Sequence, residues 1–275
     1  MSFIEQIKQR AKQEIKTIVL PEATDVRILE AAEMIKNEGY AKVILIGNEE
    51  EVRKLAKERN IDIGETKIID PAVSIETARY SKELYELRKS KGMTEEQAEK
   101  LVLEPVYFGM MMVKLNEADG LVSGAAHSTS DTLRPALQIL KTAPGTKLVS
   151  AFFVMVVPNC KYGENGTFIF ADSGLNEEPD SEKLSEIAIS SSKSFEQLVG
   201  TQPKVAMLSY STYGSAHSAS TEKVIEATKL VKEKEPNLLV DGELQLDAAI
   251  IPEVAEFKAK GSPLKGQANV LVFPD

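Results

Sequence analysis

The sequence of 275 residues contains a single cysteine, Cys160. One cysteine cannot build a disulfide framework or a cysteine-rich zinc site. No segment reaches the roughly 18 consecutive apolar residues of a membrane-spanning helix, and residues 1–13 lack the apolar run of a signal peptide. Acidic residues outnumber basic ones, 42 to 33, so the net charge is −9. We therefore expect a cytoplasmic protein that binds neither membranes nor nucleic acid, because nucleic-acid binding needs a basic face.

The remaining composition is that of an ordinary globular protein, with 43% hydrophobic and 27% charged residues. Short apolar runs alternate with longer segments of helical periodicity. This alternation is typical of parallel sheets that helices cover on both faces. We therefore predict an α/β fold with two three-layer domains and mainly parallel sheets. The Pro/Gly cluster at 141–147 marks the boundary, which gives a first domain over 1–144 and a second over 145–275.

These patterns also locate the individual elements. Strands are expected at 16–21, 42–47, 67–70, 119–124, 204–208, 238–242 and 269–273. A hairpin is expected where 148–158 and 167–172 are joined, with Asn165-Gly166 at a tight turn. Helices are expected at 1–13, 25–39, 49–58, 74–92, 94–102, 105–118, 132–141, 181–199, 219–235 and 246–257.

The sequence stops at Pro274-Asp275, directly after an apolar strand. In parallel α/β folds a loop and a covering helix normally follow such a strand. We therefore expect the chain to be a fragment of a longer protein.

Residues 123–136, SGAAHSTSDTLRPA, join a predicted strand to the start of a helix. Free backbone N–H groups at such a helix start favour anions. Hydroxyl groups there can donate hydrogen bonds to phosphate oxygens, and Arg134 can add a bidentate contact. The same residues also describe a helix that Ser130 or Asp131 caps, with Arg134 in solvent. Both interpretations stay open at this stage.

Residues 209–218, SYSTYGSAHS, repeat this arrangement after the strand at 204–208. Again the choice lies between substrate contacts and a capped helix start. The two histidines, His127 and His217, each lie in one of the two hydroxyl-rich segments, where either could act as a base. Neither has the paired spacing of a metal site, so we expect no metal.

Several longer motifs resemble one known family. SGAAHSTSDTLRPALQILKTAPG, YFGMMMVKL, FADSGLN, KVAMLSYSTYGSA, DGELQLDAA and ANVLVFPD together resemble the phosphate acetyltransferases of the phosphate acetyl/butyryl transferase family. The resemblance runs from IVLPEATDVRILEAA to VFPD. It implies reversible transfer of an acetyl group between acetyl phosphate and coenzyme A, an active site in a cleft between two α/β domains, and commonly a homodimer. It also implies that relatives continue beyond VFPD with a Ser-Arg pair and an Asp that is taken as the general base.

The resemblance also implies roles for single residues. Arg134 and Arg88 are the positions that hold substrate phosphates, and we take them as the catalytic residues, although Arg88 alone would read as a solvated arginine on a helix face. Cys160 matches a cysteine near the cleft and is not the nucleophile, because the thiolate of coenzyme A attacks acetyl phosphate directly in a ternary complex. Acetyl phosphate, inorganic phosphate and coenzyme A are the expected substrates, with no tightly bound cofactor. The candidate substrate contacts are Ser128, Thr129, Thr132, Ser211, Thr212, Gly214 and Ser215.

Two other functions remain possible from the sequence. Without the C-terminal residues, the chain could be a non-catalytic module that binds phosphate or coenzyme A. A decarboxylating dehydrogenase could use a similar scaffold, but the sequence contains no cluster of metal-binding aspartates and no dinucleotide-binding fingerprint.

Overall fold

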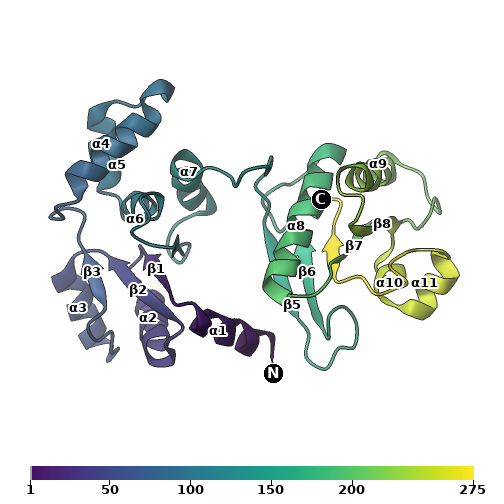
Figure 1. Cartoon of the computed structure of the whole chain (residues 1–275), viewed down its shortest axis with the longest axis horizontal. Coiled ribbons are helices and arrows are strands. Elements are labelled where there is room, and N and C mark those ends of the chain that lie inside the picture. The colour runs from purple at the N-terminus through teal and green to yellow at the C-terminus, as the bar shows by residue number, and fades with distance from the viewer. Residues whose placement is uncertain (1) are drawn as a thin grey trace. The chain divides into compact units, whose positions relative to one another are not determined.

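The computed structural model describes residues 2–275 (Figure 1). The chain divides into two compact units, unit 1 up to Lys141 and unit 2 from Thr142. Each unit has a sheet whose strands alternate with helices along the chain. The predicted α/β class with mainly parallel sheets is therefore confirmed.

Unit 1 is built on a parallel sheet in the order β3-β2-β1-β4. Because β1 pairs with β4 in parallel, the segments that follow these two strands begin side by side at their carboxyl ends, although they are about a hundred residues apart in the sequence. The elements are α1 (Phe3–Gln13), β1 (Lys16–Leu20), α2 (Val26–Glu38), β2 (Ala41–Ile46), α3 (Glu49–Glu58), β3 (Lys67–Ile69), α4 (Thr77–Arg88), the 3₁₀ helix η1 (Lys89–Lys91), α5 (Glu95–Val102), α6 (Pro105–Lys114), β4 (Gly120–Leu121) and α7 (Thr129–Ile139).

Successive residues of the unit 1 strands pack on opposite faces of the sheet, as the period of two in a strand requires. Val19 and Ile44 join a core with α4, α5, α6 and α7. Leu20 and Leu45 join a second core with α2 and α3. In Figure 1 these two groups of helices lie above and below the sheet. Both faces are buried, which explains why these strands are apolar throughout.

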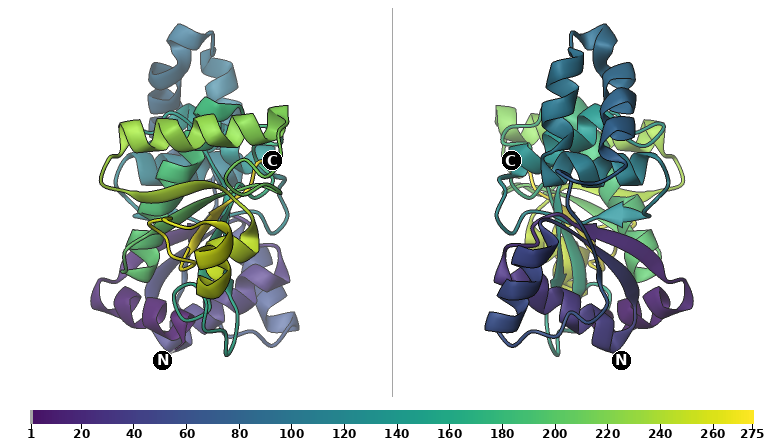
Figure 2. Two further views of the ribbon diagram at one scale, coloured as in Figure 1. Left: turned by 90° about the vertical axis from the view of Figure 1, so that its right-hand side faces the viewer. Right: turned by 90° about the vertical axis from the view of Figure 1, so that its left-hand side faces the viewer.

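Unit 2 has a mixed sheet in the order β5-β6-β9-β7-β8, in which only the pairing of β5 with β6 is antiparallel. The left view of Figure 2 shows α9 on one side of this sheet and α10 and α11 on the other. The elements are β5 (Phe152–Val156), β6 (Thr167–Ala171), α8 (Ser181–Val199), β7 (Lys204–Leu208), α9 (Ala219–Lys234), β8 (Leu239–Leu244), α10 (Leu246–Ile250), α11 (Pro252–Lys258) and β9 (Val270–Val272).

The hairpin of β5 and β6 confirms the expected antiparallel pairing. Asn165 and Gly166 both have positive φ, 51° and 86°, in a tight turn that Glu164 and Thr167 close by reciprocal backbone hydrogen bonds. A two-residue turn with two positive φ angles favours Asn-Gly. The expected hairpin turn at this dipeptide is therefore confirmed.

Several predicted elements have different bounds in the structure, and for two helices the physical reason is clear. The helix expected at 246–257 is two helices, because Pro252 has no N–H for the helical ladder and Ile251 is extended, with φ −112° and ψ 113°. The helix expected from 132 begins three residues earlier, at Thr129, because Ser128 caps it and accepts a hydrogen bond from the Asp131 N–H.

Candidate active site

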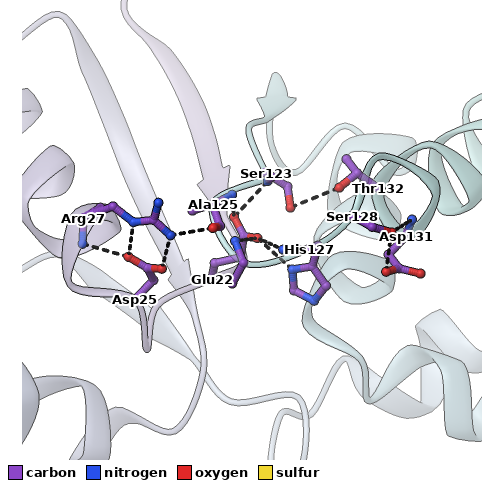
Figure 3. Close-up of polar contacts among 11 residues, drawn as sticks. Glu22, Asp25, Arg27, Ser123, Ala125, His127, Ser128, Asp131 and Thr132 are labelled. Carbon is purple, nitrogen blue, oxygen red and sulfur yellow. Dashed lines mark hydrogen bonds and ion pairs between the residues drawn. The ribbon is translucent and has the colours of Figure 1, made fainter. Parts of the chain in front are cut away.

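The turn between β4 and α7 is closed around one buried carboxylate, that of Glu22 (Figure 3). Glu22 follows β1, and β1 is the parallel neighbour of β4. The sheet therefore brings Glu22 next to the carboxyl end of β4, where the turn begins. The carboxylate accepts hydrogen bonds from four consecutive backbone N–H groups, those of Gly124 at 3.0 Å, Ala125 at 2.9 Å, Ala126 at 2.7 Å and His127 at 2.9 Å. Four N–H groups of this turn are therefore occupied by a carboxylate of the protein itself, whereas α7 begins only at Thr129.

Glu22 is ionised at neutral pH despite its burial. Its side chain is only 1% exposed, and burial alone would raise its pKa. Hydrogen bonds from the Ala126 N–H, the His127 side chain and the other amides of the turn outweigh burial and lower the pKa of Glu22 to about 2. Glu22 is thus a permanent internal anion at the end of β1.

A backbone carbonyl group of the same turn, that of Ala125, is also hydrogen-bonded. Arg27 donates one hydrogen bond to the Ala125 carbonyl oxygen at 2.5 Å and another to the Asp25 carboxylate at 2.6 Å. Asp25 caps α2 by accepting from the Arg27 N–H. Figure 3 shows the turn between Glu22 on one side and Arg27 on the other. The conformation of the turn is therefore fixed by hydrogen bonds from four of its N–H groups and to one of its carbonyl oxygens.

His127 places its ring against Glu22, with Nδ1 2.8 Å from Oε1. An ionised carboxylate can only accept, so Nδ1 carries a proton and Nε2 is the nitrogen left for other partners. The His127 side chain is 33% exposed. It lines a small pocket of about 190 Å³ together with Glu104, Val106, Tyr107, Asp131, Arg134 and Pro135.

The two predicted arginines lie near one tyrosine. Burial raises the pKa of Tyr107, and the positive charges of Arg134 on α7 and Arg88 on α4 oppose this rise, so both act on the same phenol. The Tyr107 hydroxyl donates to Gln138 at 2.9 Å. Tyr107 lines the pocket of Arg134, and Gln138 lines a second pocket with Arg88. The structure thus brings Arg88 and Arg134 to neighbouring pockets of unit 1.

Neither guanidinium is neutralised by a direct ion pair within residues 2–275. Arg134 is exposed and makes no hydrogen bond or ion pair in this part of the chain. Hydrogen bonds from Ser128 are the main cause that lowers the pKa of Asp131, and the positive charge of Arg134 contributes to this lowering. The Nε of Arg88 is buried and has no hydrogen-bond partner in the same part of the chain. Buried polar groups normally have partners, so an orphaned guanidinium nitrogen is a notable exception. Two cationic forks with free donors suit phosphate oxygens.

The hydroxyl groups of this turn differ in their freedom. Ser128 accepts from the Asp131 N–H and donates to its carboxylate at 2.6 Å, so its hydroxyl serves the helix cap. The hydroxyl oxygens of Thr132 and Ser123 lie 3.5 Å apart. Thr129 is exposed, and its hydroxyl makes no hydrogen bond within the described residues. Among the three predicted contacts of this turn, Thr129 has the most accessible donor.

The second hydroxyl-rich segment is also closed around a buried carboxylate. Glu243 on β8 accepts from the Ser211 hydroxyl at 2.9 Å and from the Gly214 N–H at 2.7 Å. The Ser215 hydroxyl accepts a hydrogen bond from the Thr212 N–H, and the Thr212 hydroxyl accepts one from the Gln245 N–H. Ser211 and Thr212 are buried, with 0% and 5% exposure. These groups hold the turn at the end of β7, and their role as substrate contacts stays a prediction.

Comparison with known proteins places this geometry in a family. The family model described as phosphate acetyl/butaryl transferase matches residues 2–275. The chain belongs to this family. The phosphate acetyltransferase of Acetivibrio thermocellus is 65% identical to it over 275 residues, which are 100% of this chain and 82% of that relative.

Solved structures agree with the family match. The EutD phosphotransacetylase from Staphylococcus aureus has 45% sequence identity and a TM-score of 0.90, with 99% of this chain and 82% of that chain covered. A phosphotransacetylase from Streptococcus pyogenes has 40% identity and a TM-score of 0.91, with 99% and 81% covered. The resemblance seen in the sequence motifs is confirmed, and this member of the phosphate acetyl/butaryl transferase family is an acyltransferase.

In this transferase the structure does not bring Cys160 to the segment 209–218. Cys160 follows β5, whose last residue pairs with the first residue of β6. The segment 209–218 follows the end of β7, which runs in the same direction as β6 through β9. The two sites therefore lie at opposite ends of the sheet, separated by roughly 16 Å over the five residues of β7. Cys160 itself packs against the core of unit 2 that includes Phe168.

No group of three or more His, Cys, Asp and Glu side chains within residues 2–275 is arranged to hold a metal ion. In the same residues, no helix is long and apolar enough to cross a membrane.

The sequence patterns did not single out three residues that contact the predicted segments or line their pockets, namely Glu22 and Tyr107 in unit 1 and Glu243 in unit 2. The signal for the two glutamates was an acidic residue just after an apolar strand, in IVLPE, or inside a mainly apolar one, in LLVDGEL. A carboxylate at a buried strand end needs donors, and a turn of small residues supplies them. Tyr107 gave no such signal, because an aromatic residue in an apolar helix reads as core.

Proposed function

We propose that this protein transfers an acetyl group reversibly between acetyl phosphate and coenzyme A. The observation that carries the proposal is the pair of guanidinium groups without an ion pair, Arg134 and Arg88, whose charges both act on Tyr107 in unit 1. Two permanent cations near one another suit a substrate pair that carries several phosphate groups. The family membership of the whole chain gives the same reaction class.

In the forward direction the coenzyme A thiolate attacks the carbonyl carbon of acetyl phosphate. The new S–C bond forms, the C–O bond to phosphate breaks, and phosphate leaves. Arg134 would hold the phosphate of acetyl phosphate with its fork and neutralise charge that grows on the leaving oxygen. Thr129 can add a hydroxyl donor from the first turn of α7.

The pocket beside Arg88 suits the phosphate groups of coenzyme A. It has a volume of about 540 Å³ and carries two further cations, Lys91 and Lys100. Met93 and Leu101 add apolar surface to its lining. A pocket that combines cations with an apolar wall fits a phosphorylated nucleotide better than a small anion alone.

The direct test is formation of the thioester. The purified protein is mixed with acetyl phosphate and coenzyme A, and acetyl-coenzyme A is followed by its absorbance and by mass. We expect turnover that requires all three components, and also the reverse reaction from acetyl-coenzyme A and phosphate. Binding of coenzyme A without turnover in either direction would contradict the proposal and favour a binding module.

We further propose that the protein works in the cytoplasm as a homodimer without a tightly bound cofactor. The exposed apolar side chains of Phe153, Met155 and Val157, on and just after the edge strand β5, support an interface between copies. The free thiol of Cys160 suits a reducing compartment. A sedimentation mass equal to one chain of 30.1 kDa at micromolar concentration would contradict the dimer, and cell fractionation tests the compartment.

Replacement of Cys160 by alanine should leave most of the activity intact. The attacking sulfur comes from coenzyme A, and Cys160 lies at the sheet end opposite the segment 209–218. We expect kcat within about threefold of the unaltered protein, since a partly buried cysteine acts mainly as a small apolar side chain. Mass spectrometry after mixing with acetyl phosphate should find no acetyl group on Cys160. A kinetically competent acetyl-cysteine would overturn direct transfer.

A further inference from the structure

The Glu22–His127 pair lies beside Arg134, and nothing in the proposed reaction has yet used it. The Nδ1 of His127 is 2.8 Å from the Glu22 carboxylate, and His127 and Arg134 line the same pocket of about 190 Å³. Figure 3 shows the imidazole between Glu22 and the first turn of α7. We propose that His127 donates a proton from Nε2 to the phosphate that leaves acetyl phosphate, and that Glu22 is its positioning residue. This inference rests on the proposed acetyl transfer.

The proton balance of the reaction requires such a donor. When the C–O bond of the acetyl phosphate dianion breaks, its leaving group would be the phosphate trianion, a strong base. The thiol of coenzyme A has meanwhile lost one proton. If the imidazolium of His127 gives its Nε2 proton to the leaving oxygen, hydrogen phosphate departs and the imidazole becomes neutral. The thiol proton then restores the imidazolium through solvent, so thiol plus acetyl phosphate yields thioester plus hydrogen phosphate.

Glu22 equips His127 for this role in two ways. Its carboxylate fixes the ring by accepting from both the backbone N–H and the Nδ1–H of His127, at 2.9 Å and 2.8 Å. The same contact keeps the proton on Nδ1 and so leaves Nε2 for the substrate, as the aspartate of a serine-protease triad fixes the tautomer of its histidine. In the reverse reaction the neutral Nε2 accepts a proton from hydrogen phosphate, which makes the phosphate oxygen a nucleophile.

The charged and titratable groups that line the pocket with His127 carry charges of both signs. Besides Glu22, the pocket contains Glu104 at the start of α6, Tyr107, Asp131 and Arg134. The Asp131 carboxylate accepts from the Ser128 hydroxyl at 2.6 Å and is therefore already engaged in the helix cap. Arg134 is the cation of this pocket, and it would hold the phosphate beside the Nε2 of His127.

The decisive variant is His127→Asn. Its side-chain amide can still donate to Glu22 from the position of Nδ1, but it has no group at Nε2. We expect kcat to fall by about 10²-fold in both directions, as is typical for loss of a general acid. The KM for acetyl phosphate should change little, because Arg134 remains. Arg59→Ala, at an exposed residue at the end of α3, is the control and should keep full activity. A His127→Asn kcat within threefold of the unaltered protein would overturn the proposal.

A double-mutant cycle tests whether Glu22 acts through His127. Glu22→Gln should lower kcat by about tenfold or more in the unaltered background, but should cost nothing further when His127 is already Asn. Circular dichroism at low temperature confirms that each variant is folded. Equal losses in both backgrounds would show that Glu22 supports only the fold, which would overturn its assignment as a positioning residue.

Nuclear magnetic resonance separates this inference from the proposed function, because the chain has only two histidines. Inorganic phosphate should shift the ring signals of His127 and leave those of His217 unchanged, and Arg134→Ala should abolish the shift. Lack of turnover by the unaltered protein would contradict the proposed function alone. If phosphate leaves the His127 signals unchanged at concentrations that saturate binding, the role of His127 is overturned whatever the turnover.

Discussion

Replacement of Arg134 by alanine is expected to lower kcat/KM for acetyl phosphate by about 10²–10³-fold. Removal of one charged donor that stabilises a developing oxyanion has an effect of this size. The guanidinium makes no ion pair within residues 2–275, so the substitution leaves no carboxylate of a broken salt bridge behind and should not lower stability. Initial rates at varied acetyl phosphate and fixed coenzyme A measure the effect.

Two further variants make the Arg134 result specific. Arg134→Lys keeps the charge but loses the bidentate fork, so it should recover only part of the activity. Arg59→Ala removes an exposed arginine at the end of α3 in the same unit and should leave the kinetics unchanged. If Arg134→Ala and Arg59→Ala had similar kinetics, Arg134 would not belong to the site.

Replacement of Glu22 by glutamine is expected to destabilise the protein by about 3 kcal/mol at pH 7. The lowering of the Glu22 pKa from 4.5 to about 2 corresponds to about 3 kcal/mol of stabilisation of the ionised form. Glutamine has one acceptor oxygen, and its NH₂ group would face backbone N–H donors. Guanidinium-induced unfolding followed by circular dichroism gives the difference. Glu65→Gln, at an exposed glutamate of unit 1 without a hydrogen bond within the described residues, is the matched control.

The same carboxylate gives the effect a defined pH dependence. The folded-state pKa of Glu22 is lowered, so its contribution is complete above the unfolded value near 4.5 and is lost as pH falls through about 2. Unfolding measured between pH 7 and pH 2 should therefore show that the difference between the unaltered protein and Glu22→Gln shrinks below about pH 4.5. A constant difference across this range would contradict the assigned ionisation.

Much of the fold could be predicted because its signals are local. Short apolar runs and the Asn165-Gly166 turn each depend on a few neighbouring residues. The segment expected as a strand at 119–124 is shorter, Gly120–Leu121, because the residues after it turn to meet Glu22. That shortening depends on a pairing between β1 and β4 that no local pattern contains.

The site was predicted only in part for the same reason. Arg134 and the hydroxyl-rich segments were visible as residue types that suit phosphate, and Arg88 was visible only through the family resemblance. The partners of these residues were not visible. Whether Ser128 contacts a ligand or caps α7, and whether Ser211 faces a substrate or Glu243, depends on neighbours brought close by the fold.

The internal carboxylate of Glu22 also determines when conformational entropy is lost. Fixing the backbone of one residue costs about 1–2 kcal/mol, so a turn of four residues in one conformation is expensive to order. Because Glu22 binds the N–H groups from Gly124 to His127, that entropy is lost during folding and not when a substrate arrives. A phosphate at Arg134 then needs to order mainly one long side chain, which costs up to about 2 kcal/mol. The affinity for a small anion can therefore depend on a single arginine.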